Sequence, residues 1–195
     1  MPGRPRVPEL DEALTEAASS LLAEVGYAAA TVNAIAARAG VPKSTLYRRW
    51  SSKAELVFAT VIHGSFIAVP DTGGLDTDLL ELSRRIVSAL NTHPARLALP
   101  GLLADLQSDP ALRQRFDREV ISAQRALVQL VLDRAVDRGE LSEPVAATDL
   151  HAQLLGTAYA WTSMFGEPSP PDLAERMACA AHSVIIRKDA DVPLS

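Results

Sequence analysis

The turn Gly-Val-Pro at residues 40–42 constrains the fold of this chain most, because it separates two short segments with helical spacing. Thr31 is a residue type that caps helices, so a short helix is expected to begin there. Gly40 suits the left-handed backbone region in which helices often end. Pro42 then opens another helix, which is expected to run to about Trp50. Two helices joined by so short a turn are typical of a helix-turn-helix unit.

Helices are expected on both sides of this unit. Residues 8–25 place apolar side chains on one helical stripe, and Gly26 is expected to stop that helix. Ser52 and Glu55 have the spacing of a capping box, so a further helix is expected from Ser52 to about Val69. The stripe of the first helix consists of Leu10, Leu14, Ala17, Ala18, Leu21, Leu22 and Val25.

The rest of the chain is also expected to be helical. Alternating runs of β-branched and aromatic residues are nearly absent, whereas Ala, Leu, Arg and Glu recur at helical spacing. The chain is therefore predicted to be all-α, with about nine helices. We expect a helix-turn-helix domain at residues 1–55 and a helical domain at residues 56–195. The later helices are expected at about 76–92, 95–107 with a kink or break at Pro100, 110–138, 146–165 and 171–187.

The helix after the turn has two chemically different faces. At about 100° per residue, Leu46 and Trp50 fall on one side, where they are expected to anchor the helix in a three-helix core. The opposite side carries a phenol, hydroxyls and a guanidinium, and no acid. Such groups suit the edges of bases in a DNA major groove. The residues of this face are Ser44, Thr45, Tyr47 and Arg48, with Lys43 and Arg49 at its borders.

The charge of the chain is unevenly distributed. The net charge is −5, which argues against a general coat on nucleic acid, because an acidic surface repels phosphate. Residues 26–53 nevertheless contain five basic residues and no acid, so this stretch carries +5 and the remainder carries −10. A basic segment in an acidic protein indicates one local surface that faces phosphate. On charge alone, a solvated charged face is the alternative.

Three further residues are candidates for phosphate contacts. Thr31 and Asn33 lie at a predicted helix N-terminus, where unpaired N–H groups and the helix dipole favour an anion. Lys53 lies at the start of the next predicted helix. Each has a simpler interpretation, for example Thr31 as a cap and Lys53 as a solvated lysine. Their occurrence together at these offsets favours DNA.

The run TVNAIAARAGVPKSTLYRRWSSKAEL at residues 31–56 resembles the DNA-binding segment of the TetR (tetracycline repressor) family. With the first predicted helix, the resemblance covers residues 10–57 approximately. It implies contacts to the DNA backbone for Thr31, Tyr47 and Lys53. It implies base or mixed contacts for Asn33, Lys43, Ser44, Thr45 and Arg48.

Two positions depart from the pattern of many family members. Ser44 stands where many have glycine or another small residue, and Trp50 stands where many have phenylalanine. The hydroxyl of Ser44 adds a hydrogen-bonding group, so the operator preference of a relative does not transfer. The basic arm at residues 3–6 is a candidate for minor-groove contact, with a disordered tail as the alternative.

The resemblance implies that the chain from about residue 75 is a helical domain for ligand binding and dimerisation. Residues 146–165 and 173–186 are rich in Ala, Leu and small residues, as close helix packing between subunits requires. Packing within one subunit is the alternative. Ligand cavities are mostly apolar with a few polar groups. The candidate pocket residues are Leu103, Leu106, Phe116, Val120, Gln124, Leu127, Tyr159, Trp161, Met164 and Phe165.

The sequence contains no motif for catalysis. His63, His93, His151 and His182 lack metal-ligand spacing, and they are most simply surface or core residues. A P-loop, a nucleophile elbow and a dinucleotide fingerprint are all missing from the sequence. The chain is therefore expected to be no enzyme, and to need no cofactor or metal.

The lone cysteine and the hydropathy pattern indicate a cytoplasmic protein. Cys179 is expected to be a small buried residue on a helix face, and a single cysteine fits a reducing compartment. The sequence lacks a run of roughly 18 apolar residues, the length that a membrane helix needs. We therefore expect no membrane partner.

Together these features predict a transcriptional regulator, most simply a repressor that binds a palindromic operator as a homodimer. Dimerisation through the last two long helices would separate two recognition helices by about 34–36 Å or a small multiple of it. A small apolar or amphipathic ligand would release the DNA. The alternative is a small-molecule binding or carrier protein whose N-terminal helices are only a scaffold. Activation instead of repression also stays open.

Overall fold

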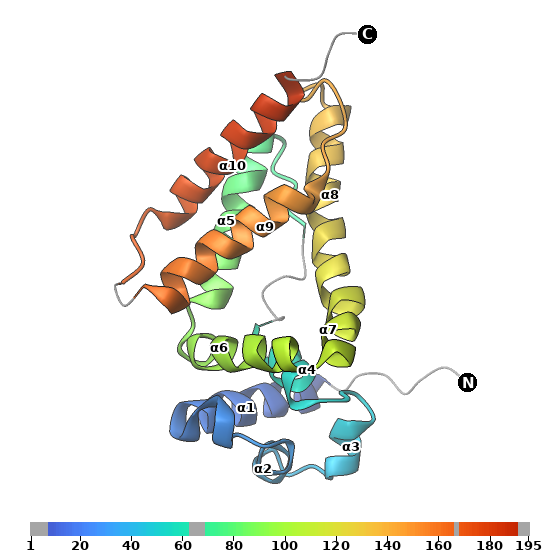
Figure 1. The fold of residues 1–195 in the computed structure, drawn as a ribbon, viewed down its shortest axis with the longest axis vertical. Helices are drawn as coiled ribbons and strands as arrows, with labels where there is room; N and C mark the ends of the chain where they lie inside the picture. Colours follow the sequence, from blue (N-terminus) through green and yellow to red (C-terminus); the bar gives the residue numbers. More distant parts are fainter. Residues whose placement is uncertain (1–7, 63–68, 166–167, 191–195) are drawn as a thin grey trace, which may run out of the picture. The chain divides into compact units, whose positions relative to one another are not determined.

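The computed structural model of the chain describes residues 8–62, 69–165 and 168–190. These residues form nine continuous helical runs and no strand, which confirms the predicted all-α class (Figure 1). Three runs contain a π-helical turn, namely η1 (Phe58–Ile62), η3 (Asp117–Ile121) and η4 (Ala160–Met164). The helices are α1 (Pro8–Ala29), α2 (Val32–Arg38), α3 (Lys43–Tyr47), α4 (Lys53–Val57), α5 (Leu75–Leu90), α6 (His93–Ser108), α7 (Pro110–Phe116), α8 (Ser122–Asp137), α9 (Ala147–Tyr159) and α10 (Leu173–Ala190).

The chain divides into two compact units that interleave along the sequence. The first unit joins residues 1–64 to residues 92–114, and the second joins residues 65–91 to residues 115–195. α6 belongs with the N-terminal helices because it packs along α1. The division at residue 55 expected from the sequence follows chain order, whereas these units follow packing.

Local sequence signals place the ends of α1 and α2. Gly26 has φ +71° and interrupts α1 where a stop was predicted, and Gly40 has φ +68° directly after α2. Residues with a Cβ adopt this conformation only with strain, which explains glycine at both positions. Thr31 Oγ1 accepts a hydrogen bond from the Ala34 N–H at 3.1 Å, which confirms the predicted cap.

The helix after the turn is shorter than predicted. α3 ends at Tyr47, although the N–H of Trp50 still donates to the carbonyl of Leu46 at 2.8 Å. The reason lies in the next helix, because Ser52 adopts an extended backbone to cap α4. The chain must therefore leave the helical conformation between Trp50 and Ser52.

The capping box at the start of α4 is formed in part. Ser52 Oγ accepts from the N–H of Glu55 at 3.0 Å, as predicted. The Glu55 carboxylate, however, accepts from the N–H of Ser51 at 2.7 Å, so the reciprocal bond goes to the residue before the cap. α4 continues into η1, and the predicted course of this helix over residues 63–68 lies outside the described residues.

A close helix contact holds α6 on α1. A Cβ at Gly101 would lie 2.1 Å from Tyr27 Cδ1, so only glycine allows this approach. The Tyr27 hydroxyl donates to the Asp105 carboxylate at 2.6 Å. Burial raises the pKa of Tyr27, and its bond to Asp105 raises it further. The break expected at Pro100 is not formed, because α6 runs through this residue.

The core of the first unit follows the predicted stripe, with one correction. Leu14 and Leu22 of α1 are fully buried together with Ile35 of α2 and Leu46 of α3. Val25, which was predicted on the same stripe, is 47% exposed because it lies directly before the kink at Gly26 that ends the stripe.

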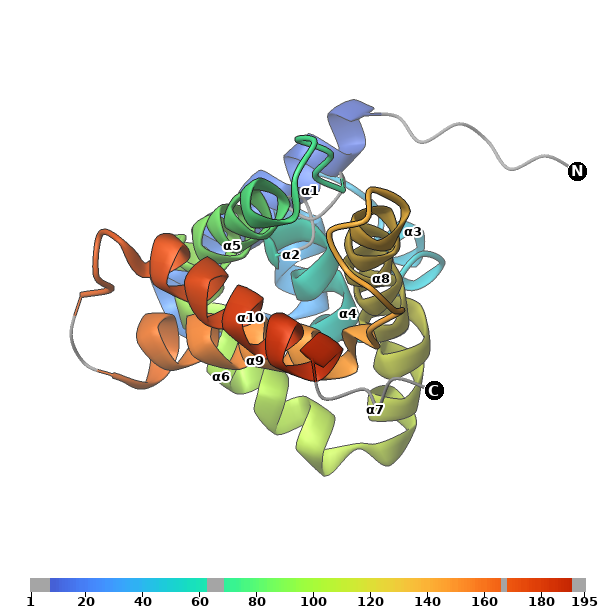
Figure 2. The same ribbon diagram turned by 90° about the horizontal axis from the view of Figure 1, so that it is seen from above.

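The second unit is a helical bundle of α5, α8, α9 and α10, and α10 lies beside α5 in both views (Figures 1 and 2). The inward face of α10 carries Met177, Ala178, Ala181 and Ile185, all of which are buried. Cys179 is exposed, so its predicted burial is wrong. At about 100° per residue, position 179 points away from the face that contains Met177.

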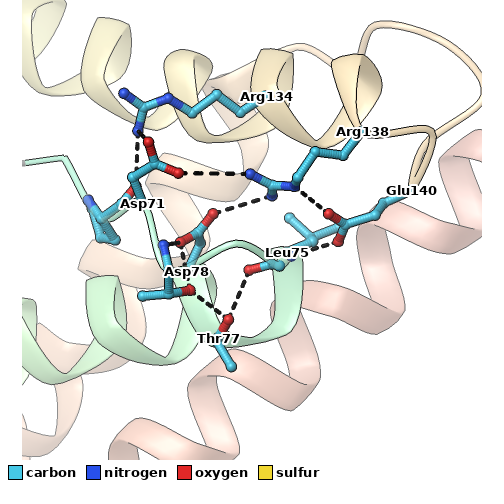
Figure 3. A network of polar contacts seen from close by, with 10 residues as sticks. Asp71, Leu75, Thr77, Asp78, Arg134, Arg138 and Glu140 are labelled. Atoms are coloured by element: carbon cyan, nitrogen blue, oxygen red, sulfur yellow. Dashed lines mark hydrogen bonds and ion pairs between the residues drawn. The ribbon is translucent and has the colours of Figure 1, made fainter.

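A polar network joins the end of α8 to the start of α5 (Figure 3). Asp78 is fully buried and accepts from the N–H of Thr72 at 2.7 Å and from Arg138 Nη2 at 3.2 Å. Arg138 also pairs with Glu140, whose other oxygen accepts from the N–H of Leu75 at 2.5 Å. These contacts lower the pKa of the Glu140 carboxyl, with the Leu75 N–H as the largest cause. The network therefore fixes α5 against α8.

Within the described ranges 8–62, 69–165 and 168–190, every helix is too short or too polar to cross a bilayer.

Candidate nucleic-acid interface and buried cavity

α3 presents the two faces that its periodicity predicts. Leu46 is fully buried, whereas Tyr47 is 52% exposed and Ser44 and Arg48 are also exposed. Thr45 is half-buried between the two faces. A buried leucine thus anchors the helix from behind, while a phenol, a hydroxyl and a guanidinium face solvent. This arrangement can offer hydrogen bonds to base edges without moving the core.

Only part of the basic segment has an unpaired charge. Arg38 makes two hydrogen bonds to the Glu24 carboxylate, at 2.7 and 2.6 Å, which lower the pKa of Glu24. Arg49 Nη2 lies 2.6 Å from Asp11 Oδ1. Within the part of the chain that the structure describes, Lys43 and Arg48 form no ion pair. The charge available to phosphate is therefore smaller than the count of +5 suggests.

Lys53 and Arg49 each lie against an aromatic ring. Lys53 Nζ lies 4.0 Å from the centroid of the Tyr27 ring and donates to the Tyr27 carbonyl at 3.0 Å. The Arg49 guanidinium lies 4.6 Å from the centroid of Trp50. These contacts hold both cations in defined positions. Lys53 therefore has a structural role in addition to its predicted one.

The predicted phosphate site at α2 is accessible. Thr31 and Asn33 are both exposed at the first turn of this helix. The Thr31 hydroxyl oxygen is the helix cap, so its hydroxyl hydrogen remains available to donate to a phosphate. The basic arm at residues 3–6 lies outside the described residues.

A small cavity lies inside the second unit, between α5, α8, α9 and the segment before α5. The space open to the centre of a water-sized molecule is about 20 Å³, which is room for about one water. Most of its wall is apolar. The apolar residues of the wall are Val69, Pro70, Leu82, Ile86, Leu127, Val128 and Leu155.

Three polar side chains complete the wall of the cavity. Arg85 pairs with Glu81, with Nε 2.7 Å from Oε1. Gln124 and His151 are only 7% and 5% exposed, and His151 Nε2 is buried without a hydrogen-bond partner. Burial lowers the pKa of His151, and the charge of Arg125 lowers it further. The imidazole is therefore neutral at about pH 7.

The structure separates the residues that the sequence suggested for a pocket. Gln124 and Leu127 line the cavity. Leu103 and Leu106 belong to the first unit, on α6. The remaining candidates lie outside the wall of this cavity: Phe116 is buried, Val120, Tyr159 and Trp161 are half-buried, and Met164 and Phe165 are exposed.

Sequence reasoning missed Arg85 and His151 as cavity residues. His151 was interpreted as an ordinary core or surface histidine, and its burial agrees with the core interpretation. Its place on α9, directly after Leu150 and about one turn before Leu154, was the available signal. The sequence pattern contains no signal that α9 packs on α5, because these two helices are far apart in the chain.

Among the described residues, His, Cys, Asp and Glu side chains do not gather in groups of three that could hold a metal ion.

Comparison with known proteins settles the family. Residues 14–60 match the family described as "Bacterial regulatory proteins, tetR family". Residues 69–181 match "Tetracyclin repressor-like, C-terminal domain". The chain belongs to the TetR family of bacterial transcriptional regulators. It is therefore a DNA-binding regulator of the helix-turn-helix type, as its resemblance implied.

TetR-family relatives cover most of the chain. The HTH-type transcriptional regulator Rv1556 of Mycobacterium tuberculosis is 41% identical over 138 residues, which are 70% of this chain and 67% of that protein. The DNA-binding transcriptional repressor TetR of Mycobacteroides abscessus is 34% identical over 146 residues, which are 73% of this chain and 74% of that protein.

A solved TetR-family structure has the same fold. The TetR family transcription regulator SCO0332 is 27% identical to this chain and superposes with a TM-score of 0.68. The match covers 96% of this chain and 100% of that chain. The fold therefore extends over both compact units and not only over the helix-turn-helix.

Proposed function

We propose that this TetR-family regulator represses transcription by binding a near-palindromic operator as a homodimer, and that a small ligand releases the DNA. The observation that carries the proposal is the exposed face of α3, where Tyr47 and Arg48 face solvent while Leu46 is buried behind them. The relative that is 34% identical is named a repressor, which supports repression over activation.

The roles that we propose at the operator follow from position. Residues on α3 and its C-terminal turn enter the major groove, and residues at the start of α2 and α4 contact phosphate. Lys43 and Arg48 contribute positive charges that form no ion pair within the described residues. Arg49 also contributes a positive charge, and its ion pair with Asp11 holds it in position. The proposed DNA contacts are Thr31, Asn33, Lys43, Ser44, Thr45, Tyr47, Arg48, Arg49 and Lys53.

Exposed apolar side chains support a dimer through the last helices. Met164 and Phe165 at the end of η4 are 65% and 49% exposed, and Ile186 of α10 is 39% exposed. Met164 and Phe165 are adjacent in the chain, and large apolar side chains that are exposed together mark sites of protein association. We propose that η4, α9 and α10 form the dimer interface, which gives the operator its two-fold symmetry.

The cavity of the second unit is the proposed ligand site. Its apolar wall and buried polar groups have the composition of a ligand cavity. A ligand that binds one conformation better than another shifts the balance between them by its differential affinity. We also propose that the protein acts in the cytoplasm and that an apolar or amphipathic molecule releases it from DNA.

Selection of bound sequences from random DNA duplexes, followed by sedimentation of the complex, tests this function. We expect a near-palindrome whose half-sites are separated by about one helical turn or a small multiple of it, bound by an even number of chains. Failure to enrich any sequence from the pool would overturn the proposal and favour the alternative of a small-molecule carrier.

A further inference from the structure

We infer that the cavity between α5, α8 and α9 takes an uncharged, mostly apolar molecule that carries one hydroxyl group, an alcohol or a phenol. This inference rests on the proposed function and names the chemical class of the ligand. It comes from two buried polar side chains, Gln124 and His151, that lie in an otherwise apolar wall.

The two polar groups have unused hydrogen-bonding capacity. His151 Nε2 is buried and has no hydrogen-bond partner among the described residues. The Gln124 amide likewise forms no side-chain hydrogen bond to a described residue, although the residue is 7% exposed. Buried groups of this kind are normally paired, because an unpaired one loses its hydration without compensation. A ligand atom at this place would supply the missing partner.

The charges around the cavity favour an uncharged ligand. Among the described residues, Arg85 is the only charged residue in the wall, and the Glu81 carboxylate already pairs with it. Burial, and after it the charge of Arg125, lowers the pKa of His151 and keeps the imidazole neutral. Arg125 lies outside the wall, and its Nε is buried without a hydrogen-bond partner among the described residues. An ion entering this apolar space would lose its hydration with no unpaired counter-charge in the wall.

A hydroxyl fits both polar groups better than a carbonyl or a hydrocarbon does. A neutral imidazole nitrogen is either a donor or an acceptor, and an amide offers both. A hydroxyl donates one hydrogen bond and accepts others, so it pairs with His151 in either tautomer and with Gln124 in either orientation. A carbonyl only accepts, and an apolar ligand would leave both side chains unpaired.

The size of the cavity links this ligand to regulation. About 20 Å³ admits a hydroxyl or a water but not an apolar skeleton. The apolar part of the ligand must therefore move the helices that line the cavity, which makes the ligand selective for a widened conformation. This selectivity is what release of an operator requires.

The test uses the full chain and three matched sets of probes. The hydroxyl compounds, called the alcohols below, are phenol, 4-ethylphenol and 2-naphthol, in order of increasing size. Their analogues without a hydroxyl are benzene, ethylbenzene and naphthalene. Their charged analogues are benzoate, 4-ethylbenzoate and 2-naphthoate. Binding is measured by calorimetry and by thermal shift. We expect at least one alcohol to bind about tenfold more tightly than both of its analogues, which corresponds to about 1.4 kcal/mol.

Substitutions then locate the hydroxyl. The double variant Gln124→Leu with His151→Phe should lose the preference for the alcohol while binding the hydrocarbon at least as well. His151→Gln, which keeps a hydrogen-bonding group, should keep part of the preference. Ser83→Ala is the matched control, because Ser83 is a buried polar residue of the same unit outside the cavity wall.

The outcomes separate this inference from the proposed function. Equal binding of alcohol and hydrocarbon, preference for the carboxylates, or no binding of any alcohol would overturn the inference. Retention of the alcohol preference in the double variant would overturn it too. Operator binding by the ligand-free chain is measured in parallel. Specific binding supports the proposed function whatever the probes do. Its absence contradicts the proposed function, whether or not the probes bind as we expect.

Discussion

The proposed DNA-binding surface on α2 and α3 and the cavity of the second unit place their polar side chains in opposite environments. The surface exposes its polar groups, so water satisfies them until DNA arrives, and it is built from about twenty consecutive residues. The cavity buries Gln124 and His151, and His151 Nε2 has no hydrogen-bond partner among the described residues. Its wall comes from residues spread over positions 69–155. The first site is ready to bind, whereas the second is unsatisfied until it is filled.

The largest effect is expected at the exposed surface. Tyr47→Ala with Arg48→Ala removes two groups of the proposed major-groove face, so specific operator binding should fall by on the order of 3 kcal/mol. Helical content and dimer mass should not change, since both side chains are exposed. A gel-shift titration with the selected duplex measures the loss.

The control for this variant is Arg96→Ala, which removes an exposed arginine of α6 in the same unit. It should leave specific binding nearly unchanged. If the folded double variant still binds its operator with full specificity, the exposed face of α3 is not the DNA interface. The contrast between an exposed DNA surface and a buried cavity would then be wrong.

The next effect concerns the network that fixes α5 beside the cavity. Asp78→Ala removes the acceptor for the Thr72 N–H and for Arg138, and should lower the free energy of unfolding by about 2 kcal/mol. Asp76→Ala is the matched control on the same helix, because Asp76 is exposed and pairs only with His182 at the surface. Urea unfolding followed by circular dichroism compares them; equal losses would mean that the network does not stabilise the bundle.

A smaller effect is expected at Lys53. Lys53→Ala should weaken binding to all DNA sequences by about 1 kcal/mol and should lower the salt dependence by about one phosphate contact. The same change removes the contact with Tyr27, so the melting temperature is measured in parallel. A change in operator preference, with the salt dependence unaltered, would show that Lys53 is no phosphate anchor.

The smallest effect is a pH dependence at the cavity. The pKa of His151 is lowered from 6.5 by burial and by Arg125, so the unfolded chain binds the proton first. The resulting stability is present above the unfolded pKa and declines as the pH falls through it. Wild type should therefore lose more stability than His151→Gln between about pH 8 and about pH 6. If urea titrations show that wild type and His151→Gln lose equal stability over this pH range, His151 lies in a solvated environment instead.

The features that could be predicted are those that depend on neighbours in the chain. Gly26, Gly40 and the Thr31 cap were predicted correctly, because each obeys a rule about backbone geometry or a bond three residues away. The buried side of α3 follows in the same way from helical periodicity. The end of α3 was missed, because it is set by the capping of the next helix at Ser52.

The features that could not be predicted depend on contacts between distant segments. Residue type suggested a buried Cys179, but the face of α10 that packs on α5 lies on the other side of the helix. Composition found Gln124 and Leu127 but missed Arg85 and His151, because the approach of α5, α8 and α9 leaves no trace in the sequence pattern. Charge counting likewise did not reveal that Glu24 and Asp11 neutralise two of the arginines.

Photo-crosslinking tests the central claim, that DNA is read by the exposed face of α3, most directly. The photoreactive analogue p-azidophenylalanine replaces Tyr47 in one protein and Tyr159 of the second unit in another, and each is irradiated with the selected duplex. We predict efficient attachment to the operator duplex from position 47 and only background attachment from position 159. Attachment from position 159 with none from position 47 would contradict the account.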